Sequence, residues 1–176
     1  MDYFHQESKR LLYRKTNEND IKSWSEFFYE NKGLKFLPID ATKDKEVLSK
    51  EWILKQIKKY NNNEFGMLSV IRKFDNKLIG MSGILIHEIE GKKEYEIAYS
   101  IIPKYWGNGY ATEIAKQIKN YAIKEKIAPR LISIIAKENK ASIRVAEKNE
   151  MMFKSEKTCF GLNVYIYEIK IDNFVK

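Results

Sequence analysis

The 176-residue sequence has one cysteine, two histidines and three prolines, and it contains no long apolar run. A single thiol, Cys159, excludes a disulfide scaffold, and two isolated histidines give no metal-ligand spacing, so we expect no metal. No stretch approaches the roughly 18 apolar residues of a membrane-spanning helix, and the first ten residues lack the apolar core of a signal peptide. These absences favour a cytoplasmic protein with no membrane partner.

The length fits one domain, residues 1–176, which is long enough to bury a core without covalent cross-links. Lysine and arginine number 32 and aspartate and glutamate 24, a formal charge of +8. Such an excess fits nucleic acid, an anionic membrane or an anionic small molecule as a partner. It also fits a composition that is simply rich in lysine, with solvated charge on every face.

Hydrophobic periodicity predicts an alternation of strands and helices, which is a mixed α/β (α+β) fold. Helical spacing of apolar residues covers 21–28, 44–60, 109–122 and 139–149. Strand-like runs cover 10–15, 65–73, 78–88, 94–102, 130–136, 152–160 and 163–171. We therefore expect about four helices and a mostly antiparallel sheet of about seven strands.

The segment with the clearest chemistry joins a predicted strand to a predicted helix across Gly107 and Gly109. Glycine adopts positive φ readily and lets a ligand approach the backbone closely. The first turn of the following helix offers unpaired N–H groups and the positive end of its dipole. The turn is thus predicted to bind an anion such as a pyrophosphate. It fits neither the dinucleotide fingerprint, because residues 103–106 separate it from its strand, nor the Walker loop, which needs Gly-Lys-Ser/Thr.

This turn resembles the acetyl-CoA loop of the GCN5-related N-acetyltransferases (GNAT) in the run Trp106-Gly107-Asn108-Gly109-Tyr110-Ala111-Thr112-Glu113. Trp106 stands where most of the family has Gln or Arg, but this form is habitual in the RimJ/RimL-like branch. Residues 139–148 are similar to that branch's Asn-x-x-Ser-x-x-Val-x-Glu-Lys, and residues 7–20 resemble its first strand and helix. The resemblance covers about the whole chain. It implies the GNAT fold, in which the fourth and fifth predicted strands, 94–102 and 130–136, splay apart.

The resemblance also implies that acetyl-CoA is the cosubstrate. Backbone N–H groups of residues 107–112 would hold its pyrophosphate, and its pantetheine arm would lie along the strand end and meet the start of the last helix. The cofactor-binding residues expected on this basis are Ile101, Ile102, Trp106, Gly107, Asn108, Gly109, Tyr110, Ala111, Thr112, Asn139 and Ser142. Five of the eight surplus positive charges fall in residues 113–130 and 137–148, which flank these positions. That placement favours a phosphate-bearing cofactor over a nucleic acid.

Acetyl transfer from a thioester to an amine needs a base for the ammonium and a proton donor for the leaving thiolate. Glu96 is the candidate base, because many relatives carry a carboxylate there, and Glu94 on the same strand face is the alternative. Many relatives place a Tyr on the last helix, but this chain has Ala146 at that position. Ser142, one helical turn from Asn139, is instead expected to donate a hydrogen bond to the sulfur. Structural roles for Glu96 and Ser142 remain open alternatives.

The sequence therefore predicts an N-acetyltransferase that moves the acetyl group of acetyl-CoA directly to a primary amine, with a protein N-terminus as the acceptor that the branch implies. A small-molecule amine is the alternative acceptor. A non-catalytic module that binds CoA or nucleic acid is the alternative from a different class. The family also implies a homodimer.

Three structural expectations accompany this interpretation. Glu150 stands where relatives end the last helix with Gly, so we expect Asn149 to adopt the left-handed conformation there. His87 is expected to be structural or to face the substrate. A group of aromatic residues either lines the acceptor cleft or packs in the core: Trp24, Phe27, Phe28 and Phe36.

Overall fold

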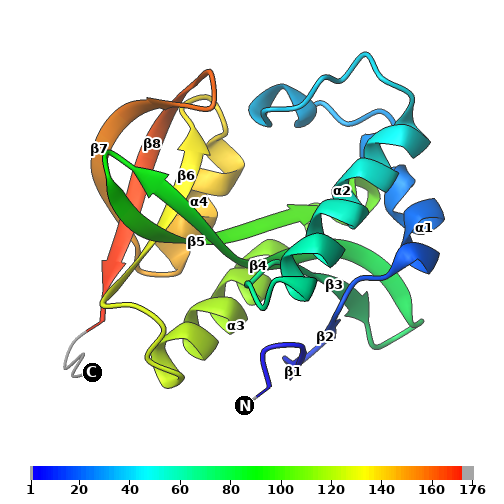
Figure 1. Cartoon of the computed structure of the whole chain (residues 1–176), viewed down its shortest axis with the longest axis horizontal. Helices are drawn as coiled ribbons and strands as arrows, with labels where there is room; N and C mark the ends of the chain where they lie inside the picture. Colours follow the sequence, from blue (N-terminus) through cyan, green and yellow to red (C-terminus); the bar gives the residue numbers. More distant parts are fainter. Residues whose placement is uncertain (1, 172–176) are drawn as a thin grey trace.

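The computed structural model describes residues 2–171, which fold around one eight-stranded sheet in the order β1-β2-β3-β4-β5-β6-β8-β7 (Figure 1). The strands are β1 (His5–Glu7), β2 (Leu11–Arg14), β3 (Met67–Arg72), β4 (Lys77–Ile89), β5 (Lys92–Ile101), β6 (Arg130–Ala136), β7 (Met152–Cys159) and β8 (Leu162–Lys170). The mixed α/β class and all seven predicted strands are confirmed. The additional strand, β1, has three residues, which is too short for alternation to reveal it.

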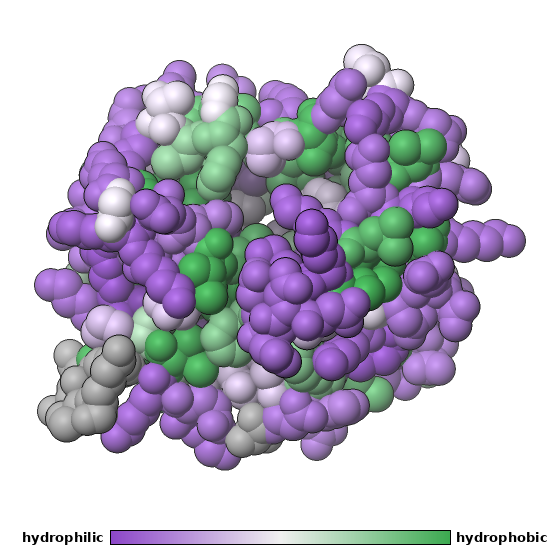
Figure 2. Space-filling model, viewed as in Figure 1, coloured by the Kyte–Doolittle hydropathy of each residue, from purple (hydrophilic) through white to green (hydrophobic). Residues whose placement is uncertain are grey.

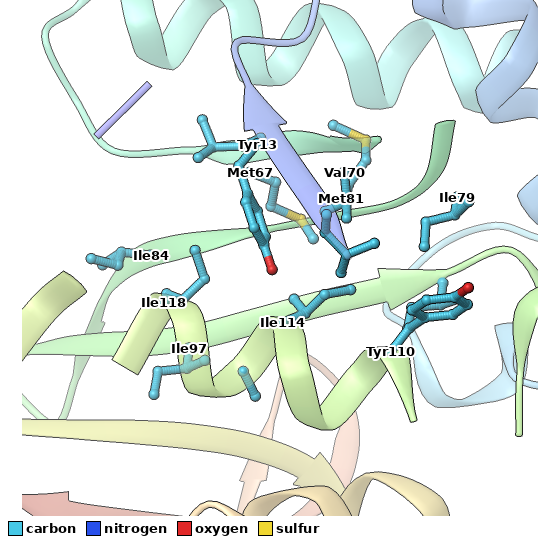
Figure 3. Close-up of a cluster of buried hydrophobic side chains, with 14 of the residues drawn as sticks. Tyr13, Met67, Val70, Ile79, Met81, Ile84, Ile97, Tyr110, Ile114 and Ile118 are labelled. Carbon is cyan, nitrogen blue, oxygen red and sulfur yellow. The ribbon is translucent and has the colours of Figure 1, made fainter. Parts of the chain in front are cut away.

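Four α-helices accompany the sheet, as predicted: α1 (Ile21–Ser25), α2 (Lys45–Asn61), α3 (Tyr110–Lys124) and α4 (Lys140–Lys148). The helical pattern over 21–28 becomes a short α-helix between two 3₁₀ turns, residues 18–20 and 26–28. In both Figure 1 and Figure 3, α2 lies on one side of the central strands and α3 on the other. None of the helices within residues 2–171 is long and apolar enough to cross a membrane.

The splayed strand pair is the feature that positions the site. Strands β5 and β6 are parallel, whereas every other neighbouring pair is antiparallel, and they share one register pair, Glu96 with Ile132. Beyond that pair, side chains replace the backbone ladder. The Ser133 hydroxyl donates to the Ile97 carbonyl at 3.2 Å, and the Ile134 N–H donates to the Glu96 carboxylate at 3.3 Å. The expected splay of 94–102 from 130–136 is thus confirmed.

The core fixes α3 against the strand that carries the site. Ile114 and Ile118 of α3 are fully buried and point toward the sheet (Figure 3). Ile84 and Ile97, which face each other across β4 and β5, are 0% and 2% exposed. Each such side chain stabilises the fold by about 1.5–3 kcal/mol relative to exposure. This packing fixes the start of α3, and therefore the glycine turn before it.

The aromatic residues near the first helix divide between the two roles left open by the sequence. Trp24, Phe27 and Phe28 are at most 4% exposed, and the Trp24 and Phe27 rings stack at 4.5 Å. They form an aromatic cluster with Trp52 of α2. These three residues belong to the core, whereas Phe36 lines the cleft described below.

Candidate active site

A cleft of about 630 Å³ opens where β5 and β6 diverge. It is bounded by these strands, the start of α4, residues 36–40, α2 and the turn between β7 and β8. Figure 2 shows the surface hollowed between the two halves that β4 and β5 connect in Figure 1. Three predicted site residues line this cleft: Glu96, Asn139 and Ser142. Glu96 is thus brought together with two residues that lie 43 and 46 positions later in the sequence.

The glycine turn has the backbone geometry expected of an anion site. Gly107 and Gly109 have φ of 77° and 74°, and Gly109 is the N-cap residue of α3. In the part of the chain that the structure describes, no acceptor is bonded to the N–H groups of residues 107–112. Asn108 closes the turn by donating to the carbonyls of Tyr105 and Trp106. Six adjacent N–H groups are therefore available to an anion.

A contact that the sequence did not reveal holds this turn in place from the connection between β1 and β2. The Glu113 carboxylate, in the first turn of α3, accepts hydrogen bonds from the Ser8 hydroxyl at 2.7 Å and from the Arg10 N–H and Nε at 2.8 and 2.6 Å. Burial raises the pKa of Glu113, but these hydrogen bonds outweigh it and lower the pKa below its ordinary value. Arg10 also donates to the Asn108 carbonyl at 3.0 Å. Arg10 and Glu113 are 103 positions apart in the sequence, so only the folded structure reveals this contact.

Nine of the eleven expected cofactor residues lie outside the cleft lining: Ile101, Ile102, Trp106 and residues 107–112. Ile101 and Ile102 are 7% and 2% exposed. The Ile102 N–H donates to the Ile79 carbonyl at 3.0 Å, and the Ile101 carbonyl accepts from the Trp106 indole at 2.7 Å. The residues of β5 that do line the cleft are 96–100. The cleft lining on β5 therefore ends one residue before Ile101.

Asn139 and Ser142 meet at the start of α4 on the cleft wall. The Asn139 side-chain carbonyl accepts from the Ser142 N–H at 3.1 Å and so caps the helix. Asn139 is thus the capping residue, and the Ser142 hydroxyl is not needed for that role. The Tyr99 hydroxyl of β5 donates to the Ser142 carbonyl at 3.3 Å. Burial raises the pKa of Tyr99 to about 12, although a hydrogen bond to Ser142 acts in the opposite direction.

Glu96 lies at the vertex of the splay, and its two carboxylate oxygens are both engaged. One accepts from the Ile134 N–H, and the other is 2.7 Å from Nε2 of His87. The side chains of His87 and Glu96 are only 20% and 13% exposed, and both line the cleft. His87 therefore lines the cleft, as a histidine that faces the substrate must. Its pairing with Glu96 follows from the β4–β5 register, a signal that the sequence analysis did not use.

Glu94, the alternative base, faces a different environment. Its carboxylate is paired with the Arg130 guanidinium, which also donates to Glu168 at 2.9 Å. Glu94 does not line the cleft within the described residues. Arg130 and Lys137 belong to the segments whose positive charge the sequence analysis assigned to the phosphates. Both pair with carboxylates of the protein itself, so part of that charge is neutralised within the chain.

The end of α4 differs from the expectation. Glu150 has φ of 65°, whereas Asn149 has φ of −97°, so the expectation that Asn149 is left-handed is wrong. The buried Lys119 of α3 explains the difference, because its ammonium donates to the Asn149 carbonyl at 3.0 Å and to the Glu150 carboxylate at 2.7 Å. These contacts hold the non-glycine residue in a conformation that costs roughly 1–2 kcal/mol.

The comparisons with known proteins agree with this geometry. The family profile described as acetyltransferase (GNAT) domain matches residues 10–152. The chain belongs to the GNAT acetyltransferase family. The resemblance carried by residues 106–113 and 139–148 is thereby confirmed, and membership identifies an acyltransferase of a family that uses acetyl-CoA.

Two curated relatives come from Bacillus subtilis. YkkB, an uncharacterised protein, is 35% identical over 101 residues, which are 57% of this chain and 59% of YkkB. YnaD, an uncharacterised N-acetyltransferase, is 29% identical over 144 residues, which are 82% of this chain and 80% of YnaD. The chain thus spans less than two thirds of YkkB but most of YnaD.

Solved structures share the whole fold. An acetyltransferase (GNAT family) from Bacillus anthracis superposes with a TM-score of 0.74 at 27% identity and covers 96% of this chain and 99% of its own. RimL, a ribosomal L7/L12 α-N-protein acetyltransferase in complex with coenzyme A, has a TM-score of 0.74 at 17% identity, with 94% and 96% covered. At that identity the likeness to RimL concerns the fold alone.

Proposed function

We propose that this chain transfers the acetyl group of acetyl-CoA directly to a primary amine, and that the acceptor is the N-terminal amine of a protein or peptide. The observation that carries the proposal is the convergence of Glu96, Asn139 and Ser142 on one cleft. The fold that the chain shares with RimL supports this acceptor, because that protein is an α-N-protein acetyltransferase.

The cofactor would span two features, the cleft beside residues 96–100 of β5 and the glycine turn that follows this strand. The N–H groups of residues 107–112 would bind the pyrophosphate, and Asn139 would donate its free amide hydrogens to the pantetheine arm inside the splay. Acetyl-CoA supplies the activated acetyl group. Ser142 would donate a hydrogen bond to the sulfur as the carbon–sulfur bond breaks, and Glu96 would take up the proton that the ammonium loses, directly or through an intervening group.

The acceptor would enter between residues 36–40, α2 and the β7–β8 turn. This part of the lining combines apolar groups from residues 36–39, Trp52 and Phe160 with charged side chains of both signs, Asp40, Lys43, Glu51, Lys55 and Lys59. Its apolar groups suit the first residues of an extended peptide better than they suit a polycation. The +8 charge of the chain also disfavours a polyamine, because like charges repel.

Release of free CoA thiol tests the proposal. We expect acetyl-CoA to be consumed with peptides that carry a free N-terminus, and not with the same peptides after N-terminal acetylation. Spermidine, free amino acids and an aminoglycoside supply the small-amine alternatives, and turnover with these alone would contradict the peptide acceptor. Binding of DNA or RNA that weakens steeply with salt, without thiol release, would instead favour a non-catalytic module.

A further inference from the structure

A histidine–carboxylate pair stands at the vertex of the splay, where β4 and β5 form one face of the cleft. His87 is in register with Glu94, so Glu96 is its diagonal neighbour on the same face of the sheet. Nε2 of His87 lies 2.7 Å from a Glu96 oxygen. The Phe160 ring, 5.2 Å from the imidazole centroid to centroid, contacts the histidine from the β7–β8 turn. Three elements therefore hold the imidazole in one orientation.

The hydrogen bonds assign the roles of the two imidazole nitrogens. Glu96 accepts from the Ile134 N–H through one oxygen, which marks its carboxylate as an acceptor. Nε2 of His87 must then carry the hydrogen that lies between it and the other oxygen. Nδ1 keeps its lone pair, and in residues 2–171 no protein group is bonded to that atom. His87 lines the cleft, so an acceptor nitrogen without a protein partner lies on the wall of a cleft whose chemistry requires a base.

We propose that His87 is the catalytic base that meets the acceptor and that Glu96 is the positioning residue behind it; this inference rests on the proposed acetyl transfer. The acceptor ammonium gives one proton to Nδ1, and Glu96 stabilises the imidazolium. The neutral amine attacks the thioester carbon, a C–N bond forms and the C–S bond breaks. The second amine proton passes to the departing thiolate, so the products are the amide and CoA thiol. His87 returns its proton to water.

The identity of the base bears on the class of amine. An imidazole takes a proton from an α-ammonium, whose ordinary pKa is about 8, far more readily than from a lysine ammonium, whose ordinary pKa is about 10.4. The pair therefore favours a chain N-terminus over a lysine side chain at neutral pH. This selectivity agrees with the proposed acceptor, and it comes from the chemistry of the base rather than from the shape of the cleft.

His87 and Glu96 share the cleft with seven other titratable groups. They are Asp40, Lys43, Glu51, Lys55, Lys59, Tyr99 and Cys159. Hydrogen bonds from Thr42 lower the pKa of Asp40, pairing with Glu51 raises that of Lys43, and burial raises that of Tyr99. Cys159 is the remaining group that needs a control variant.

The first experiment reads the tautomer without any acceptor. The chain has two histidines, so imidazole ¹⁵N spectra of the full protein contain two ring systems, and His5→Gln assigns them. His5 is a matched control, because it also contacts a carboxylate, Asp2 at 2.6 Å, but is 77% exposed. We expect His87 to be protonated at Nε2 and not at Nδ1 in its neutral form. A proton on Nδ1 would overturn the proposal.

The second experiment compares pH–rate profiles with a free N-terminal peptide. We expect His87→Gln to lower kcat/KM on the order of 100-fold at pH 7 and to abolish the acid limb of the profile. His5→Gln and Cys159→Ser should retain both, and added imidazole should partly restore His87→Ala. Unchanged thermal unfolding and acetyl-CoA affinity would show that His87→Gln is folded and loaded.

The outcomes separate this inference from the proposed function. If His87→Gln keeps the wild-type profile while Glu96→Gln loses activity, Glu96 acts on the amine directly and the inference is wrong, although the acetyl transfer stands. If the wild-type protein releases no thiol with any amine, the proposed function itself fails. If His87→Gln unfolds, the tautomer measurement and imidazole rescue of His87→Ala decide the matter.

Discussion

Adding one methyl group at Gly107 tests whether the glycine turn holds the pyrophosphate of acetyl-CoA. A Cβ at Gly107 would meet no heavy atom within 4 Å, so Gly107→Ala introduces no clash. Its cost is the left-handed conformation, φ of 77°, which amounts to about 1–2 kcal/mol for an alanine. For a chain of this length each kcal/mol lowers Tm by roughly 2–4 °C.

The effect on cofactor binding should be larger than the effect on stability. The methyl group stands among the six unbonded N–H groups of residues 107–112, and hydrogen bonds to a charged group contribute about 1.5–3 kcal/mol each. Loss or displacement of one such bond raises the Kd for acetyl-CoA at least about tenfold. Titration calorimetry with acetyl-CoA measures this change directly.

Gly91→Ala is the matched control. Gly91 has φ of 72°, and a Cβ there also meets nothing within 4 Å, but it lies in the turn between β4 and β5. Both variants should lose similar stability, and only Gly107→Ala should lose affinity. Equal acetyl-CoA affinity in the two variants would refute the assignment of the turn to the pyrophosphate.

Three further changes test other parts of the structure. Ser142→Ala should lower kcat with little change in KM for acetyl-CoA, as steady-state kinetics will show, and an unaltered kcat would remove Ser142 from the chemistry. Burial opposes ionisation of Asp20, but hydrogen bonds from Arg14 and its neighbours outweigh it and lower the pKa below 3.8. The ionised form is thus favoured by folding, so its stabilisation is complete above about pH 4 and is lost as pH falls below 3.8; urea midpoints against pH should fall in acid for the wild type and less for Asp20→Asn. Lys119→Met should lower stability by about 1–3 kcal/mol in thermal unfolding, because it leaves the Asn149 carbonyl without its donor, whereas acetyl-CoA affinity should not change.

Local pattern was sufficient for most of the fold. The amphipathic spacing of α3, the glycine turn before it and the alternation of β8 each concern residues close in sequence, where periodicity is informative. The short strand β1 escaped because three residues contain no period. The conformation at Glu150 escaped because it depends on Lys119, 31 residues earlier, whose ammonium satisfies the end of α4.

The candidate site was predicted only where its residues lie within a motif. Asn139 and Ser142 share one helix turn, so their common side follows from spacing. The pairing of Glu96 with His87 depends instead on the register of two strands, and a shift of one residue would send the side chains to opposite faces. The bracing of the glycine turn by Arg10 joins residues 98 positions apart, and no local pattern encodes it.

The divergence of β5 and β6 leaves a backbone N–H without a strand partner, and Glu96 pairs with it. Where β6 leaves β5, the Ile134 N–H loses its strand partner, and a carboxylate from the same vertex accepts it. A largely buried carboxylate is costly without a second partner, and His87 provides one. Glutamine at 96 keeps an oxygen for Ile134 and an amide hydrogen for Nε2, so the splay persists while the imidazole tautomer inverts. Glu96→Gln should therefore keep the thermal stability of the wild type yet lose activity, whereas Glu96→Ala should lose both stability and activity. Activity that follows stability in the two variants would show that Glu96 serves the architecture alone.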